Sequence, residues 1–314
     1  EAGPAEVLVA EVSSFQLEAV DEFRPRVAVF TNLYPDHLDR YEDSMERYLQ
    51  AKLRLFARQT AEDVAIVNAD RPESARVAAA TQARVIHTSV QARQPGGVYA
   101  ADGQIVCEVG GAPVAVAPVD AVRLRGAHNL SNVLEAVAAV AALGLPVARV
   151  AAETLAAFRG VANRLEEVDT VDGVTFYNDS QGTTPMAVQV ALQAFAATPP
   201  VLIAGGRAKV HDFDELGADI ARGARALVAI GEAAEALGAA VRRAAADFPV
   251  YRAETLPEAV RLAFRLARPA GVVLLSPACA SFDMFRNMEH RGEVFREAVR
   301  NEKWRTEHEK CRIE

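Results

Sequence analysis

Short apolar runs recur along the chain, and each is followed by a stretch rich in polar or small residues. Such runs predict strands that are buried on both faces, as in parallel sheets. The runs cover residues 7–10, 27–30, 64–68, 176–178, 201–204, 227–230, 249–251 and 272–275. The chain is therefore expected to contain parallel β-sheet in both halves.

Helical periodicity separates these strands. Residues 44–58 carry apolar side chains at 45, 48, 49, 53 and 56 behind an Asp43-Ser44 cap, which predicts a helix with the stem of Lys52 on its inner face. Further helices are expected from residue 126 to about 143, from Pro146 and from Thr184. Glycine-punctuated alternation over residues 98–124 predicts hairpins.

Residues 158–164 interrupt the pattern, and we interpret them as a hinge. Beyond Glu166 strands and helices alternate, which predicts a doubly wound α/β sheet with ligand loops at the carboxyl ends of its strands. We expect two α/β domains, residues 1–162 and 163–314.

Composition excludes several functions. The net charge of −8 and pI near 5.4 provide no basic surface for nucleic acid or for an acidic membrane. No apolar run approaches the ~18 residues of a membrane span, and the first residues lack the basic start of a signal peptide. The three cysteines are widely spaced, which favours neither disulfides nor zinc. We expect a cytoplasmic protein.

Lysine is scarce: the chain has four, Lys52, Lys209, Lys303 and Lys310, among 34 basic residues. Unlike arginine, lysine can lose its proton and act as a nucleophilic amine. Lys52 follows His37 by fifteen residues (52 minus 37), and Glu11 precedes His37 by twenty-six (37 minus 11). Taken singly, each of these residues also has an ordinary structural interpretation. Lys52 would be a helix-surface cation, His37 a turn residue and Glu11 a strand-end charge.

Together the three residues resemble the ATP-dependent Mur ligases of peptidoglycan synthesis, in which a Glu, a His and a carbamylated Lys occur in this order and spacing. The resemblance implies that Glu11, His37 and Lys52, as its carbamate, form a catalytic Mg²⁺ site. Hard oxygen ligands suit this ion. Carbon dioxide adds only to a neutral amine, so Lys52 is expected near cations or in a dry pocket.

Other segments extend the resemblance to nucleotide binding. The segment His128-Asn129-Leu130-Ser131-Asn132 is read either as a helix cap or, by resemblance, as a contact to the nucleotide base. Asn178 to Pro185 follows a strand and opens a helix, which suits either an anion site or a capped turn. The residues expected to bind ATP are Asn129, Asn132, Arg164 and Asp179.

The segment Ser276-Pro277-Ala278-Cys279-Ala280-Ser281-Phe282-Asp283 resembles the D-glutamate-adding branch of the family. Residues expected to bind D-glutamate are Thr183, Lys209, Ser281 and Phe282. The chain departs from the family pattern at Asn163, where His is usual, at Gln181, where some relatives have Lys, and at Met288, where Phe is commoner.

By resemblance, the fold is part of a central ATPase domain with an incomplete parallel sheet, followed by a Rossmann-like C-terminal domain. The implied activity is ATP-dependent ligation of D-glutamate to UDP-N-acetylmuramoyl-L-alanine through an acyl phosphate, by a monomer. No Gly-Lys dipeptide occurs, so the P-loop that cradles the nucleotide phosphates is missing. We therefore expect an N-terminally truncated chain that is inactive alone. Two alternatives remain: a folylpolyglutamate-synthase-like ligase, and a non-catalytic remnant that binds nucleotide or amino acid.

Overall fold

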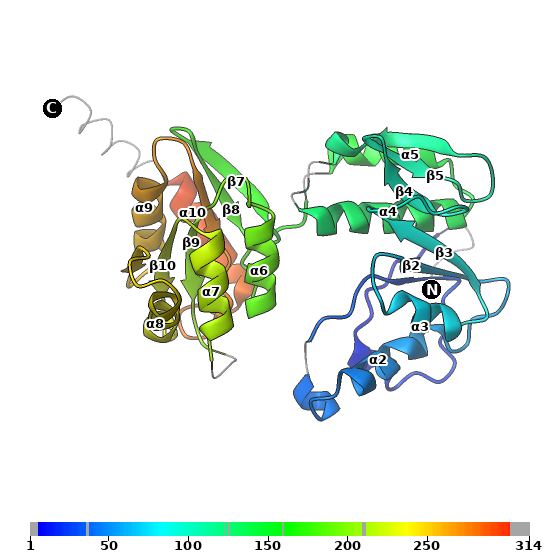
Figure 1. Ribbon diagram of the computed structural model, residues 1–314, viewed down its shortest axis with the longest axis horizontal. Coiled ribbons are helices and arrows are strands. Elements are labelled where there is room, and N and C mark those ends of the chain that lie inside the picture. The colour runs from blue at the N-terminus through cyan, green and yellow to red at the C-terminus, as the bar shows by residue number, and fades with distance from the viewer. Residues whose placement is uncertain are drawn as a thin grey trace. The chain divides into compact units, whose positions relative to one another are not determined.

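The computed structural model describes residues 6–35, 38–122, 124, 126–158, 160–208 and 212–301. Internal contacts divide the chain into unit 1 (Glu1–Arg123 and Ala127–Phe158) and unit 2 (Leu124–Gly126 and Arg159–Glu314). Each unit is built around a sheet of its own (Figure 1). No helix in the described part of the chain is long and apolar enough to cross a membrane.

The sheet of unit 1 has the order β1-β2-β3-β4-β5-β6, parallel from β1 to β4 and antiparallel from β4 to β6. The expected strands at 27–30 and 64–68 and the hairpins within 98–124 are confirmed. The sequence pattern missed β3, because its alternating polar residues are not an apolar run. The strands are β1 (Val27–Phe30), β2 (Val64–Asn68), β3 (Arg84–Ser89), β4 (Val98–Ala101), β5 (Gln104–Cys107) and β6 (Val114–Pro118).

Helices cover both faces of this sheet. Leu134 and Val137 of α4 pack with Ile66 and Ile86 on one face, whereas Leu49 of α2 packs against the other face. The expected cap is confirmed, since Ser44 Oγ accepts from the Arg47 N–H and α2 begins at the next residue. The helices and turns are α1 (Ser14–Leu17), η1 (Leu38–Tyr41), α2 (Met45–Leu53), η2 (Arg54–Phe56), α3 (Ser74–Ala79), η3 (Val119–Ala121), α4 (Ala127–Ala142) and α5 (Val147–Ala157).

The strand expected at residues 7–10 is wrong, because the described residues 6–10 form no strand. Val7, Leu8 and Val9 are 62%, 82% and 89% exposed. A strand forms only where a neighbouring backbone accepts and donates its ladder hydrogen bonds. An apolar run shows that burial would be favourable, but it carries no information about whether such a neighbour is present.

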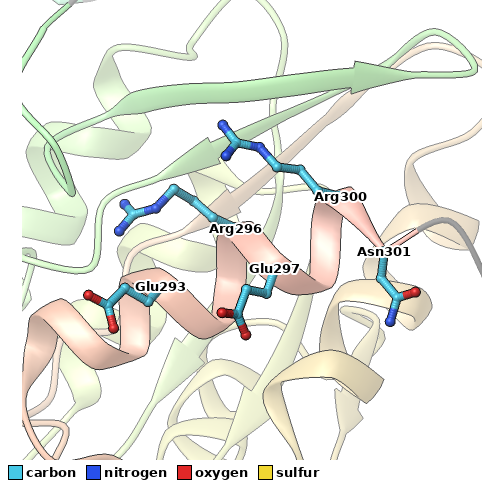
Figure 2. Close-up of a pocket in the computed structure, with 5 residues that line it drawn as sticks. All are labelled: Glu293, Arg296, Glu297, Arg300 and Asn301. Carbon is cyan, nitrogen blue, oxygen red and sulfur yellow. The ribbon is translucent and has the colours of Figure 1, made fainter.

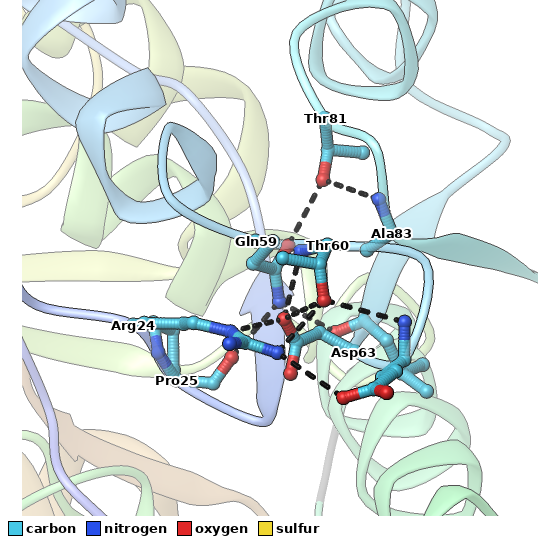
Figure 3. A network of polar contacts seen from close by, with 9 residues as sticks. Arg24, Pro25, Gln59, Thr60, Asp63, Thr81 and Ala83 are labelled. Atoms are coloured by element: carbon cyan, nitrogen blue, oxygen red, sulfur yellow. Dashed lines mark hydrogen bonds and ion pairs between the residues drawn. The ribbon is translucent and has the colours of Figure 1, made fainter.

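A polar network joins the segments that enter the first three strands of unit 1 (Figure 3). Arg24 Nε donates to Asp63 Oδ2 over 2.7 Å, and Gln59 Nε2 donates to the carbonyls of Pro25 and Val64. Thr81 Oγ1 donates to Gln59 Oε1 over 3.1 Å. These contacts anchor the amino ends of the strands. The carboxyl ends, where ligands bind in open α/β sheets, carry other residues.

The sheet of unit 2 has the order β11-β10-β9-β12-β8-β7 and is parallel except at β7. The expected doubly wound sheet is confirmed. Only β7 escaped prediction, because this antiparallel edge strand is half charged. The strands are β7 (Glu166–Val171), β8 (Val174–Asn178), β9 (Val201–Gly205), β10 (Ala226–Ile230), β11 (Val250–Arg252) and β12 (Val272–Leu275).

Three layers enclose the core of unit 2. One face of the sheet packs against α6, α7 and α8, and the opposite face packs against α9 and α10 (Figure 1). The sheet fixes the loops that leave its carboxyl edge. The helices are α6 (Pro185–Gln193), α7 (Asp214–Gly223), α8 (Ala234–Ala244), α9 (Leu256–Ala267) and α10 (Met288–Arg300).

Candidate functional site

Three loops of unit 2 leave the carboxyl ends of β8, β9 and β12, which are parallel neighbours, and therefore meet at one edge of the sheet. The Ala278 N–H donates to the Gly182 carbonyl over 2.8 Å, and the Gly205 N–H donates to the Pro277 carbonyl over 2.9 Å. Arg207 and Ala280 exchange a pair of backbone hydrogen bonds. The structure thus brings together loops that lie 72 to 96 residues apart in the sequence (277 minus 205 and 278 minus 182).

Asp179 lies at the junction of these loops. Its Oδ2 accepts from Ser276 Oγ over 2.7 Å, and its Oδ1 accepts from the Leu165 N–H over 3.3 Å. Burial raises the pKa of this carboxyl to about 6, against the opposing hydrogen bond from Ser276 and the charges of Arg164 and Arg291. Such a carboxyl is poised near neutral pH, which is typical of functional sites.

The absence of a side chain at Gly182 keeps this junction compact. A Cβ at Gly182 would lie 2.8 Å from Ser276 Oγ and still nearer to Asp179 Oδ2. Glycine is required here for the close approach of the two loops, not for a positive φ.

A fully buried arginine, Arg291 of α10, joins two of the loops. Its Nε donates to Ser180 Oγ over 3.0 Å, its Nη2 to the Ser180 carbonyl over 2.9 Å and its Nη1 to the Cys279 carbonyl over 3.1 Å. Burial lowers its pKa to about 10, so it stays charged at neutral pH. The planar fork of arginine suits this bridge.

Sequence reasoning did not identify Arg291, although a signal was present. Arg291 falls on the same helical stripe as Phe295, Ala298 and Val299, which are all buried. A charge on an apolar stripe indicates a buried polar contact.

The residues expected to bind D-glutamate lie on these loops where they are described. Thr183 follows Gly182 and is half-buried, Ser281 is buried, and Phe282 is 63% exposed. Lys209 lies outside the described residues. Arg207, close to Lys209 in sequence, forms an ion pair with Glu232 at 3.2 Å. The structure therefore gathers Thr183, Ser281 and Phe282 at one sheet edge, next to Asp179.

The residues expected to contact the nucleotide base lie in unit 1. Asn129 and Asn132 occupy the first turns of α4, and Asn132 Nδ2 donates to Asn129 Oδ1 over 3.4 Å. Their helix begins beside the carboxyl ends of β2 and β3, because Asn68 at the end of β2 donates to Ser131 Oγ over 2.8 Å. The two carboxamides thus lie at the ligand edge of their sheet.

Glu135, one turn further along α4, is a buried carboxyl that the sequence analysis missed. Its Oε1 lies 3.5 Å from Ser131 Oγ, and its Oε2 has no hydrogen-bond partner in the described part of the chain. Burial raises its pKa to about 8. It is the only charged residue in the Ala-rich stretch of α4, and this was the signal that could have revealed it.

The proposed metal ligands are only partly described. Lys52 is half-buried on α2, with Nζ 4.8 Å from the centre of the Tyr48 ring. Glu11 is exposed, three residues before α1, and α1 is tied to the end of α2 by the hydrogen bond from Arg54 Nε to the Leu17 carbonyl over 2.8 Å. His37 lies outside the described residues. No cluster of three or more His, Cys, Asp or Glu side chains that could hold a metal occurs within the described ranges.

Comparison with known proteins now adds the family. Residues 2–140 match the Mur ligase middle domain, and residues 163–279 match the Mur ligase glutamate ligase domain. The chain belongs to the Mur ligase family. Two curated relatives carry the name UDP-N-acetylmuramoylalanine–D-glutamate ligase. This Mur ligase chain is 46% identical to the one from Pelotomaculum thermopropionicum and 44% identical to the one from Salinibacter ruber, each over 95% of its length. It spans 64% and 65% of the lengths of these two relatives.

Solved structures support the same fold. MurF from Acinetobacter baumannii superposes with a TM-score of 0.65 at 20% identity, covering 90% of this Mur ligase chain and 62% of that one. Folylpolyglutamate synthase from Mycobacterium tuberculosis superposes with a TM-score of 0.62 at 20% identity, covering 86% and 64%. These likenesses confirm the α/β architecture of the family.

Proposed function

We propose that this chain is the catalytic and amino-acid-binding part of a ligase that joins D-glutamate to UDP-N-acetylmuramoyl-L-alanine in peptidoglycan synthesis. The observation that carries the proposal is the 46% identity to a relative of that name over nearly the whole chain. The segment from Ser276 to Asp283 supports it, because it occupies the carboxyl edge of the unit 2 sheet.

The proposed reaction has two steps. ATP first phosphorylates the L-alanine carboxylate and leaves as ADP, and the amine of D-glutamate then attacks the acyl phosphate and displaces phosphate. Phosphoryl transfer depends mainly on positioning and on neutralising charge. A bound Mg²⁺ would supply part of that neutralisation. This requirement is consistent with a site rich in polar and charged positioning groups.

We assign the nucleotide and metal functions to residues 1–162. Asn129 and Asn132 would contact the base, and Glu11, His37 and carbamylated Lys52 would hold Mg²⁺. Carbamylation joins CO₂ to the neutral Lys52 amine and releases a proton, and the product is an oxygen ligand suited to Mg²⁺.

We assign D-glutamate binding to residues 163–314, in which Arg164 and Asp179 would add contacts to the nucleotide. Ser281 would donate its hydroxyl to a substrate carboxylate. Thr183 and Phe282 flank the same loops, and Lys209 would supply a cation for the second carboxylate. The proposed substrates, ATP and a UDP-linked precursor, are cytoplasmic metabolites, so we place the enzyme in the cytoplasm. We also propose that it is a monomer.

Calorimetric titration with D-glutamate and with L-glutamate tests the proposal on this chain. D-Glutamate is expected to bind more tightly, and Ser281→Ala is expected to weaken it at least fivefold. Thr198→Ala removes an exposed hydroxyl elsewhere in unit 2 and serves as the matched control. Preference for L-glutamate would favour a folylpolyglutamate-synthase-like ligase. Absence of binding by either glutamate and by ADP would favour a non-catalytic remnant.

A further inference from the structure

Arg164 is exposed, and the backbone is strained at the residues on both sides of it. Asn163 and Leu165 have φ values of +63° and +42°, in the left-handed region. A non-glycine residue pays of order 1 kcal/mol or more for this conformation, and a bulky residue such as leucine seldom adopts it. Two such residues around one arginine persist only if neighbouring groups hold them.

Hydrogen bonds hold this segment at each residue. The Asn163 N–H donates to Glu166 Oε2 over 2.9 Å, and the Asn163 carbonyl accepts from the Gln181 N–H over 3.1 Å. The Leu165 N–H donates to Asp179 Oδ1 over 3.3 Å. The backbone on either side of Arg164 is therefore fixed to the loop that follows β8.

The side chains of Asn163, Glu166, Asn178 and Arg296 form one cluster, here called the hinge knot. Glu166 Oε2 accepts from Asn178 Nδ2 over 3.1 Å and from Arg296 Nη1 over 2.8 Å, in addition to the Asn163 N–H. Asn163 Oδ1 accepts from Asn178 Nδ2 over 2.9 Å and from Arg296 Nη1 over 3.0 Å. One carboxylate oxygen and one amide oxygen thus share the same two donors.

Arg296 brings α10 into the hinge knot. The side chains of Arg296 and Glu166 are only 21% and 23% exposed, so water screens this ion pair less than a surface pair. Figure 2 shows Arg296 on the same helix as Arg300, with which it lines a pocket of about 490 Å³. Arg300 is exposed and has no place in the knot.

Gly292, one turn before Arg296, fits the knot closely. A Cβ built there would overlap Asn163 Oδ1 and lie 3.1 Å from Asn178 Nδ2. The absence of a side chain at Gly292 therefore leaves the space that the Asn163 amide occupies. Asparagine suits the site because it tolerates a positive φ and offers an amide oxygen to two donors.

We propose that Glu166 and Arg296 are positioning residues for Arg164, because the hinge knot locks the strained backbone from which Arg164 projects and so fixes the direction of its guanidinium. The inference rests on the proposed function, in which Arg164 contacts a nucleotide phosphate. It also accounts for Asn163 at a position where the family resemblance leads one to expect histidine, because asparagine tolerates the positive φ and its amide oxygen accepts hydrogen bonds from Asn178 and Arg296.

The first test reads the hinge directly and needs no ligand. In Arg296→Met, amide exchange measured by mass spectrometry should rise at least tenfold in peptides covering residues 160–168, and Gly292→Ala should act in the same direction. Arg300→Met makes the same chemical change one turn along α10 and should leave these peptides unchanged. Exchange in Arg296→Met equal to that in Arg300→Met would overturn the proposal.

The second test is a double-mutant cycle on ADP affinity, measured by calorimetry on the full chain. Arg296→Met should weaken ADP three- to tenfold in the parent, but should cost nothing further in the Arg164→Met background, because both act through one guanidinium. An equal loss in both backgrounds, or no loss from Arg164→Met itself, would overturn it. If the parent binds no ADP, the nucleotide assignment fails, whereas the exchange test still decides whether the knot holds the hinge.

Discussion

Glu135→Gln tests the buried polar face of α4, because it keeps the size of the side chain and removes its ionisation. The carboxyl is 3% exposed and its pKa is raised by burial to about 8 from the usual 4.5, while Ser131 and the charge of Arg71 oppose this rise. Burial also lowers the pKa of His128, in the first turn of the same helix.

The direction in which the free energy of unfolding changes with pH follows from proton binding. Because the folded-state pKa is raised, the folded protein holds a proton that the unfolded chain loses between pH 4.5 and about 8. The free energy of unfolding therefore falls as pH rises through this window, by up to about 1.4 kcal/mol per pH unit. Over the whole window this amounts to about 5 kcal/mol, and between pH 6 and pH 8 to about 2 kcal/mol.

Glu135→Gln should remove this slope. At pH 5 the variant and the parent should differ by less than about 1 kcal/mol, whereas at pH 8 the variant should be the more stable by several kcal/mol. The assay is urea unfolding at a series of pH values, followed by hydrogen exchange in peptides from α4 and β2 so that unit 1 is read separately from unit 2.

Glu153→Gln provides the matched control, because Glu153 is exposed on α5 of the same unit. It should leave the pH profile of the parent unchanged. Parallel profiles for the parent and Glu135→Gln would refute the reasoning, since they would mean that Glu135 is ionised in the folded protein at neutral pH.

Four further outcomes are expected. Arg291→Met should destabilise unit 2 by about 3 kcal/mol in thermal unfolding, because it removes buried hydrogen bonds to the Ser180 and Cys279 carbonyls. Arg286→Met, at an exposed site, should be neutral, and equal melting temperatures for the two variants would contradict this. Gly182→Ala should weaken D-glutamate at least tenfold by pushing apart the loops that Asp179 and Ser276 join, and unchanged affinity would show that their spacing does not matter. In bicarbonate buffer, native mass spectrometry should detect a carbamate on the parent chain that is lost in Lys52→Arg. The 314-residue chain should show little or no ligase turnover, because it has no Gly-Lys dipeptide. Turnover at the rate of an intact ligase would contradict this expectation.

The amino-acid sequence by itself determined the strands that are buried on both faces and the loops that follow them. Apolar runs such as residues 201–204 and 272–275 favour a buried strand, because their side chains must leave water and their backbone must pair. The Ser44 cap was equally readable, since capping depends on residues three apart. The segment after β12 was chosen as a candidate site from its resemblance to the family pattern.

Tertiary structure decided whatever depends on a partner distant in sequence. Residues 7–10 have the composition of a strand but pair with no strand among the described residues, whereas β3 and β7 are mostly polar and still pair. Arg291 binds oxygens of Ser180 and Cys279, which lie on other segments, and neighbouring elements bury Glu135. The hinge knot joins Asn163 to Arg296 across 133 residues. The pattern of apolar residues indicates which side chains leave water. Only the fold determines which polar groups then meet, because each must find its partner in space.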